Sequence, residues 1–304
     1  MPLYFAGMDE AGYGPVLGPL VLSAVIFELP ESFDRLGKTT NLWECLPMTN
    51  SAGNFAKHAQ TYLPVCDSKK MFQPSKGIGM LERSVLSFAR MLTANPFESY
   101  SDLCLPLKAR SDRVDALSAV LRKELDKKGI RFRDVFIKVV DAEEFNKCVR
   151  ECGNKSDFLF HIASGIMKRI CSEYSGKGKL RIAIGKQGGR TYYHSALQEV
   201  FSDCAVSNVK ETRNTSVYRF ADDDIEISFL KDGEDRDFFI ALASMFGKYT
   251  REMEMIRFNR LFIDRFPQIK PTAGYPTDAR RFIRDVTPLA EKIGLEMDKF
   301  IRIK

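Results

Sequence analysis

Short apolar runs near the start of the chain predict two β-strands joined by a turn. Residues 3–8 and 20–27 are apolar and of strand length. The segment between them is rich in glycine and proline, the residues that mark turns most strongly. Three further strands are predicted at 130–140, 179–184 and 225–230, from apolar runs or from alternation.

Apolar residues recur at helical spacing in several longer stretches, most clearly over 239–260. Further helices are predicted over 74–91, from an N-cap at Ser111 to Gly129, from an N-cap at Ser156 to the glycines at 176 and 178, and from Thr277 onward. Strands that come first and then alternate with helices predict an α/β fold. We expect a mixed central sheet flanked by helices, with a helical C-terminal part.

The composition is ordinary for a soluble globular protein, with 46 basic against 40 acidic residues and a net charge of +6. This small basic excess fits a protein that approaches nucleic acid, but many proteins without such a partner share it. No apolar run is long enough to span a bilayer, and the first residues lack a signal-peptide pattern, so we expect a cytoplasmic protein without membrane contact. The seven cysteines lack CxxC spacing and predict free thiols; a metal site at Cys148 and Cys152 is the less favoured alternative.

Two adjacent carboxylates, Asp9 and Glu10, follow the first apolar run and precede a glycine-rich turn. Like charges this close raise each other's pKa unless a cation intervenes. A hard divalent cation such as Mg²⁺ is the natural partner, because it takes a few carboxylates and keeps water ligands for phosphates. Gly12, Tyr13 and Gly14 could bring backbone N–H groups close to a ligand. Polar turn residues in a hairpin are the alternative interpretation of each.

Other charged segments could bind a polyanion or a metal, although solvated surface charge is an alternative for each. Lys69 and Lys70 could face phosphates, as could the glycine-rich and basic segment 185–190. The acidic segment 232–237 precedes the longest helix, where acids favour the helix dipole but could also ligate a metal. Three polar residues of that helix lie on one stripe and could follow a phosphate backbone: Ser244, Lys248 and Arg251.

Four motifs in this order resemble the type 2 ribonuclease H family. They are DEAGYGP at 9–15, DSKK at 67–70, ALASMFGKYTRE at 241–252 and GYPT at 274–277. The family has corresponding elements DEAGRGxxxGP, DSKK, AASIxAKxxRD and GYxT. The type 3 branch shares the first two motifs, but it carries an extra domain before the first strand, so we disfavour it.

The resemblance implies a ribonuclease H-like fold and four carboxylates that hold two divalent ions, Mg²⁺ or Mn²⁺. Asp9 and Glu10 match the first two acids. Counting ten residues back from Ser244 places the fourth acid at Glu234, where the family has Asp; Asp235 is the alternative if the loop is one residue shorter. The third acid is missing, because Gly185 stands at the matching position.

The family further implies a substrate, which is an RNA–DNA hybrid or a duplex with embedded ribonucleotides. The loop with Gly12, Tyr13 and Gly14 is implied to contact the ribose 2′-OH, with Tyr13 standing where the family usually has Arg. Tyr275 matches a tyrosine that stacks near the RNA–DNA junction. Four further residues of the matched motifs are candidates for contact with the nucleic acid: Lys69, Lys70, Ser244 and Lys248.

The whole chain, 1–304, is expected to form one ribonuclease H-like domain with insertions near 28–66 and 95–145. The expected activity is two-metal hydrolysis of the RNA strand. Gly185 motivates a second hypothesis, a homologue that binds nucleic acid but is weakened or inactive in catalysis. A third is a related nuclease with another phosphodiester substrate, because a fold does not choose a substrate. The oligomeric state is left open.

Overall fold

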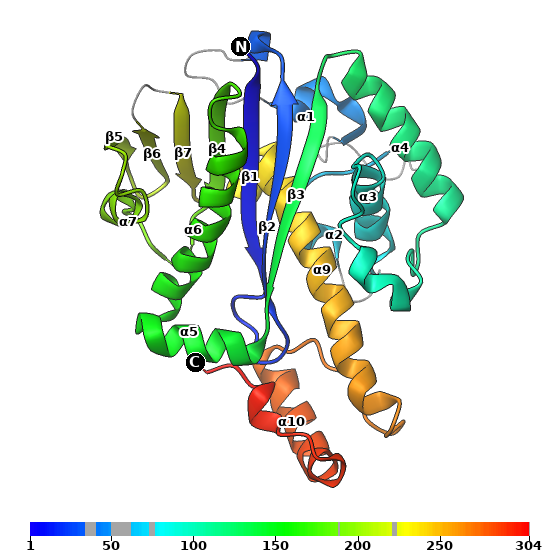
Figure 1. The fold of residues 1–304 in the computed structure, drawn as a ribbon. Coiled ribbons are helices and arrows are strands. Elements are labelled where there is room, and N and C mark those ends of the chain that lie inside the picture. Colours follow the sequence, from blue (N-terminus) through cyan, green and yellow to red (C-terminus); the bar gives the residue numbers. More distant parts are fainter. Residues whose placement is uncertain (34–40, 50–61, 73–76, 188, 221–223, 304) are drawn as a thin grey trace.

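A computed structural model describes residues 1–33, 41–49, 62–72, 77–187, 189–220 and 224–303. Its centre is one seven-stranded sheet in the order β3-β2-β1-β4-β7-β6-β5 (Figure 1). β1, β4 and β7 are parallel, whereas β2, β3, β6 and β5 pair antiparallel to their neighbours. The strands are β1 (Leu3–Ala11), β2 (Leu20–Leu29), β3 (Arg131–Val140), β4 (Lys179–Gly185), β5 (Val206–Glu211), β6 (Thr215–Phe220) and β7 (Ile225–Leu230).

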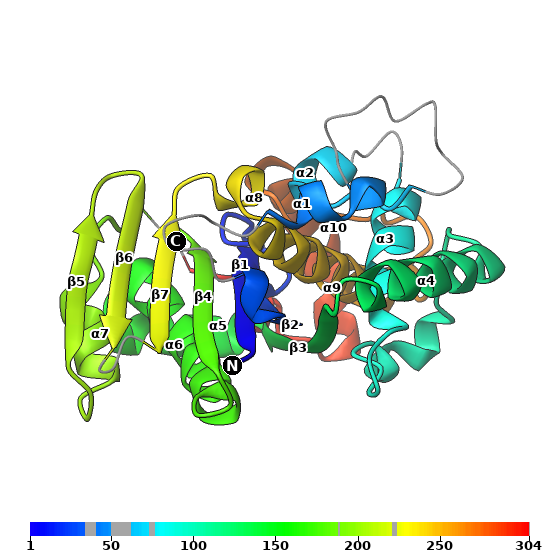
Figure 2. The same cartoon turned by 90° about the horizontal axis from the view of Figure 1, so that it is seen from above.

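Helices cover both faces of this sheet (Figure 2). They are α1 (Leu42–Cys45), α2 (Ser68–Met71), α3 (Gly79–Ala89), α4 (Ser111–Asp126), α5 (Ala142–Cys152), α6 (Lys155–Tyr174), α7 (His194–Val200), α8 (Gly233–Arg236), α9 (Phe238–Ile263) and α10 (Pro276–Ala290). The predicted mixed sheet flanked by helices, with a helical C-terminal part, is therefore confirmed.

Alternation along β1 divides the interior into two cores. Leu3 and Phe5 face the core that β1 and β2 share with α3, α4 and α9. Tyr4, Ala6 and Met8 face the opposite core with α5, α6 and α7, because successive strand residues point to opposite faces.

Helix α9 lies directly on β1, and this contact fixes the end of the strand beneath the helix N-terminus. A Cβ added at Gly7 would stand 2.0 Å from the carbonyl carbon of Phe239, so only glycine permits the approach. Asp237 caps α9 by accepting hydrogen bonds from the N–H groups of Phe239 and Ile240, at 2.9 and 3.0 Å. The capped end of α9 is thus held beside β1.

The strands and helices that the sequence predicts are present, with three corrections. β1 continues past Met8 to Ala11, so the acidic pair lies within the strand and not after it. The cap of α6 is Asn154, whose side chain accepts from the Asp157 N–H, and not Ser156. Ser111 is the first residue of α4, and the cap position belongs to Arg110. The first part of the predicted helix 74–91, residues 74–76, lies outside the described residues, as does most of 34–61.

No helix in the described ranges is long and apolar enough to cross a membrane. All seven cysteines lie within those ranges and are free thiols, as predicted. Cys148 and Cys152 share helix α5, and burial raises the pKa of both thiols above its usual value.

Glu82 is a buried carboxylate that joins α3, α9 and the segment before α4. It accepts backbone hydrogen bonds from Leu107, Lys108 and Ala109, each at 2.7 Å, and one from the Tyr249 hydroxyl at 2.9 Å. Glu82→Ala should lower the free energy of unfolding by about 3–5 kcal/mol, because it removes the acceptor of the buried Tyr249 hydroxyl and of three partly buried N–H groups. Urea titration measures the loss. Glu98→Ala, an exposed control, should change it by less than about 0.5 kcal/mol.

Candidate active site

The carboxyl ends of the parallel strands β1, β4 and β7 meet at one edge of the sheet. Asp9 and Glu10 lie at this end of β1, and Gly185 is the last residue of β4. The parallel register pairs Met8 with Ile184, which places Asp9 beside Gly185. Strand β7 leads into α8, which carries Glu234 and Asp235 to the same edge. Figure 2 shows α8 next to α2 above the end of β1.

The Asp9 carboxylate is enclosed between β1, β4 and helix α9. The residue is only 7% exposed, and its side chain is hydrogen-bonded to Ser244 of α9. The hydroxyl groups of Ser244 and Ser68 are in turn 3.1 Å apart, which connects α9 to α2. Burial raises the pKa of Asp9 well above its usual value, and the charges of Glu10 and Glu234 raise it further.

Glu10 lies next to Asp9 but points to the other side of the strand, as neighbours on a strand do. Burial raises the pKa of Glu10 to about 7, the charge of Glu234 adds to this, and Lys69 opposes it. One oxygen, Oε2, is buried and has no hydrogen-bond partner. An unpartnered buried carboxylate oxygen among other carboxylates calls for a cation.

The two acids of α8 face different partners. Lys69 Nζ lies 3.7 Å from Glu234, whose charge acts on both Asp9 and Glu10. Asp235 forms an ion pair with Lys70 and is 52% exposed in its side chain. The geometry therefore groups Glu234 with the β1 acids and directs Asp235 toward the α2 lysine.

A divalent cation fits the donor chemistry of this edge. Asp9, Glu10 and Glu234 offer hard oxygen ligands, and all three charges crowd one another. In the described part of the chain, however, no three acidic, histidine or cysteine side chains already converge closely enough to hold an ion. At the third predicted ligand position, a Cβ added to Gly185 would lie 2.8 Å from Asp9 Oδ1. The Asp9 carboxylate thus faces the place where a side chain at 185 would begin.

The glycine loop, defined here as residues 12–19 between β1 and β2, begins beside these acids. Gly12 has φ of +86°, a conformation that favours glycine, and an added Cβ would meet Arg251 Nε at 2.5 Å. Tyr13 packs partly into the core below, and Gly14 is exposed. Tyr275 is 50% exposed, with the Arg251 guanidinium 5.7 Å from its ring centre.

The predicted backbone contacts differ in their accessibility. Lys69 and Lys70 of α2 are exposed, with 81% and 56% of their side chains accessible. Ser244 is buried, and Lys248 is largely covered because it pairs with Glu252 at 2.5 Å and lies over the Phe72 ring. The expected polar stripe of α9 is therefore not a solvent-facing surface, because α2 and the glycine loop cover it.

The sequence pattern did not identify three buried residues near the site individually. Gln187 is buried just after β4, and neither atom of its side-chain amide has a hydrogen-bond partner. The Gln187 N–H donates to the Tyr193 hydroxyl at 3.0 Å, and burial raises the pKa of Tyr193 to about 12. Arg302, near the end of the chain, is also buried, and its guanidinium donates to the Pro15 carbonyl of the glycine loop. The sequence showed that the loop at 185–190 is basic. It could not show which residues of the loop are buried, because contacts with distant segments determine that.

The metal-free protein is expected to lose stability as the pH rises through the range 4.5 to 7. The pKa of Glu10 is raised from 4.5 to about 7 in the folded state. The folded protein therefore holds this proton where the unfolded chain has lost it, and stability falls with rising pH by about 1.4 kcal/mol for each pKa unit. Asp237, whose pKa burial raises to about 6, acts in the same direction. Thermal melts with a chelator on both sides of this range measure the effect, and Asp237→Asn should reduce it.

No family model matches the chain, and no curated protein matches it. Solved structures that resemble it include the RNase HII of a PCNA:RNase HII complex from Archaeoglobus fulgidus, at 16% identity and TM-score 0.45, covering 99% of this chain and 94% of that one. The ribonuclease H2 from Pyrococcus horikoshii OT3 has 14% identity and TM-score 0.47, covering 98% and 92%. Bst-RNase HIII in complex with Mn²⁺ has 12% identity and TM-score 0.43, covering 99% and 66%.

These solved structures come from the group of ribonucleases that the four sequence motifs resemble.

Proposed function

We propose that this chain is a metal-dependent endoribonuclease that hydrolyses the RNA strand of RNA–DNA hybrids, or ribonucleotides embedded in duplex DNA. The observation that supports this most is the grouping of Asp9, Glu10 and Glu234 at one sheet edge, where the pKa values of Asp9 and Glu10 are raised and one carboxylate oxygen of Glu10 has no partner. Exposed lysines and a glycine loop border the same edge. Acids that need a cation, next to groups that attract phosphate, are the requirements of phosphodiester hydrolysis.

Asp9, Glu10 and Glu234 would hold the Mg²⁺ or Mn²⁺ ions. When bound, such ions polarise the phosphate and lower the pKa of water. Lys69 and Lys70 attract the phosphate backbone from the exposed side of α2. Substrate phosphates can replace Glu234 and Asp235 as partners of these lysines, which releases the two acids.

The glycine loop supplies the discrimination between RNA and DNA. Only the 2′-OH distinguishes the two strands locally, and backbone N–H groups close to Gly12 and Gly14 can contact it. The exposed ring of Tyr275 is placed beside this loop by Arg251 and can stack on the sugar–base edge.

The specific alternative is a nucleic-acid-binding protein with weak or absent catalysis. Gly185 favours it, because three carboxylates supply fewer ligands than the four that the resemblance implies for two ions. We expect slow cleavage in preference to none, because the acids that remain are still grouped.

The decisive experiment incubates the purified chain with a labelled RNA–DNA hybrid, a duplex containing one ribonucleotide, and an all-DNA duplex. Mg²⁺ and Mn²⁺ are supplied separately, and a chelator is the control. Metal-dependent cleavage of either ribonucleotide-containing substrate, with the DNA duplex intact, supports the proposal. Salt-sensitive hybrid binding without turnover in either metal would replace it with the binding-protein alternative.

A further inference from the structure

The glycine loop contacts a segment from the far end of the sequence. We define residues 301–303 as the C-terminal strap. The Arg302 N–H donates to the Val16 carbonyl at 2.8 Å, and Leu17 forms an antiparallel bridge with Ile301. The Arg302 guanidinium also donates to the Pro15 carbonyl. In Figure 1 the red end of the chain runs along the lower side of α5, near the loop that joins β1 and β2.

Helix α5 fixes the other side of the strap through one buried side chain. Asn146 donates to the Ile301 carbonyl at 2.8 Å and accepts from the Ile303 N–H at 2.8 Å. The Arg302 guanidinium lies 4.8 Å from the centre of the Phe145 ring. The strap is therefore pinned between α5 and the loop by backbone contacts on both of its edges.

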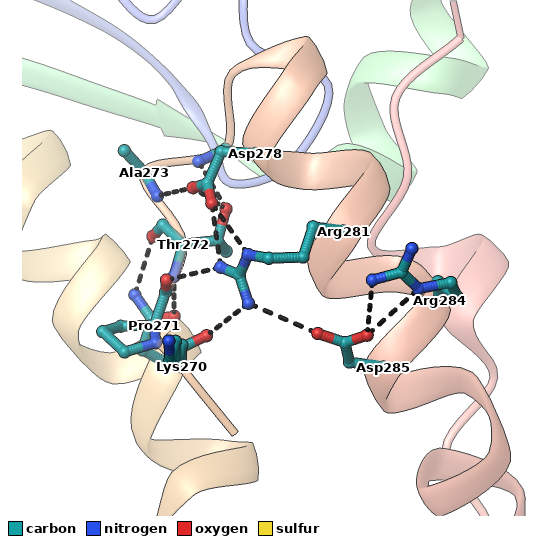
Figure 3. Close-up of polar contacts among 10 residues, drawn as sticks. Lys270, Pro271, Thr272, Ala273, Asp278, Arg281, Arg284 and Asp285 are labelled. Carbon is teal, nitrogen blue, oxygen red and sulfur yellow. Dashed lines mark hydrogen bonds and ion pairs between the residues drawn. The ribbon is translucent and has the colours of Figure 1, made fainter. Parts of the chain in front are cut away.

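The opposite side of the loop is held by the turn before α10. The N–H groups of Val16 and Leu17 donate to the Gly274 carbonyl, at 2.9 and 3.2 Å. Figure 3 shows the hydrogen bonds within this turn: Asp278 accepts from the Thr272 hydroxyl at 2.6 Å and from the Ala273 N–H at 2.9 Å. The loop thus lies between a fixed turn and the strap.

Two buried guanidinium groups lie under this loop with little counter-charge. Arg251 and Arg302 are 1% and 2% exposed, and both have buried N–H groups without a hydrogen-bond partner. Arg251 has Glu252 at 3.8 Å, but no carboxylate of the described residues lies within ion-pair distance of Arg302. Burial, and then the charge of Arg251, lowers the pKa of Arg302 to about 9. An uncompensated buried charge costs stability and is retained when another requirement outweighs the cost.

We propose that Arg302 is a positioning residue for substrate recognition: the C-terminal strap holds the glycine loop in the shape that contacts the ribonucleotide, and the Arg302 guanidinium adds positive charge beneath it. This inference rests on the proposed function and extends it to a part of the chain outside the four motifs. The strap binds the carbonyl groups of Pro15 and Val16 and thereby limits the movement of the loop residues that precede them. The buried charge attracts the polyanionic substrate to this loop.

The first test measures amide hydrogen exchange at Val16 and Leu17 in the full chain. Arg302→Met removes the guanidinium but keeps an apolar side chain of similar length, and Asn146→Ala loosens the strap from the side away from the loop. Both variants should exchange these amides about tenfold faster or more, because the loop opens locally more often. Arg284→Met removes an equal charge from the exposed face of α10 and should match the unmodified protein.

The second test measures the affinity for a labelled RNA–DNA hybrid without added metal, and then KM and kcat with metal. Arg302→Met should weaken hybrid binding about tenfold and raise KM, with kcat changed less than about twofold, because bound substrate re-forms the loop. Arg302→Lys should restore part of the affinity. The melting temperature of Arg302→Met should not fall, since the variant removes a buried charge that no carboxylate of the described residues pairs with. A purely structural arginine would instead lower it.

The outcomes separate the strap from the proposed function. If amide exchange at Val16 and Leu17 is unchanged in both variants, the inference that the strap holds the glycine loop is wrong. Faster exchange with hybrid affinity equal to that of Arg284→Met overturns the role in recognition. If the unmodified chain does not bind the hybrid while both variants still exchange faster, the strap stands and the proposed function fails.

Discussion

Asp9→Asn should lower the rate of metal-dependent cleavage by about 1,000-fold or more, the largest loss that we expect from a single substitution. Asn has the same shape as Asp and can keep the hydrogen bond to Ser244, but it is a poor ligand for a hard cation. The metal-free variant should melt at a higher temperature, because the substitution removes a buried charge that Glu10 and Glu234 repel. Lower activity with higher stability distinguishes a lost ligand from a damaged fold.

Asp235→Asn is the matched control for this prediction. Asp235 is also an acid at the same sheet edge, but it is half exposed and pairs with Lys70. The cleavage rate of Asp235→Asn should change less than about threefold, because an exposed ion pair contributes little energy. The cleavage rates of Asp9→Asn and Asp235→Asn are compared under single-turnover conditions. Cleavage by Asp9→Asn at the unmodified rate would end the assignment of this edge as the active site.

The position of the acidic pair could be predicted from the sequence because local pattern determines it. An apolar run followed by Asp9, Glu10 and glycines requires a buried strand that leads into a tight turn. Only the end of this strand was predicted wrongly, because the pairing of β1 with β2 continues past Met8 through Ala11. The choice between Glu234 and Asp235 needed the structure, because neighbouring residues on a short helix differ only in the direction of their side chains.

The helix α9 shows where pattern reasoning fails. Its predicted polar stripe assumed one solvent-facing side, yet α9 is buried along most of its length beneath β1, β2, α2 and α3. A helix covered on every side has no amphipathic face to detect. The polar side chains there make internal contacts: Ser244 is hydrogen-bonded to Asp9, and Arg251 lies against Gly12 of the glycine loop.

Elements at the edge of the sheet and contacts between distant residues were also beyond sequence reasoning. Strand β5 is largely exposed at the sheet edge and lacks the alternation that marks a half-buried strand. The contact of Arg302 with Pro15 joins residues that are 287 positions apart. No local pattern encodes such a pair, and its existence depends on how α10 returns the chain end to the loop.

Gly185→Asp should raise the rate of cleavage about tenfold or more and increase the number of Mn²⁺ ions bound per chain. The side chain would start 2.8 Å from Asp9 Oδ1, so the carboxylate of Asp9 must move aside, which a side-chain terminus can do without backbone change. The new carboxylate would then stand beside Asp9, the position that the family resemblance gives to the third acid. A further negative charge should also lower the melting temperature of the metal-free protein, and Mn²⁺ should reverse that loss.

Gly185→Asn is the control, because it introduces nearly the same shape without the charge. If Asn at 185 increases cleavage as much as Asp does, the gain comes from packing and not from a restored ligand. Mn²⁺ titration followed by electron paramagnetic resonance counts the bound ions independently of turnover. More bound ions with more cleavage, in Gly185→Asp alone, mean that the chain is a nuclease limited by one missing ligand. More bound ions with no cleavage would mean that the carboxylates bind metal for a purpose other than hydrolysis, since the ligand set is then complete and the chemistry is still absent.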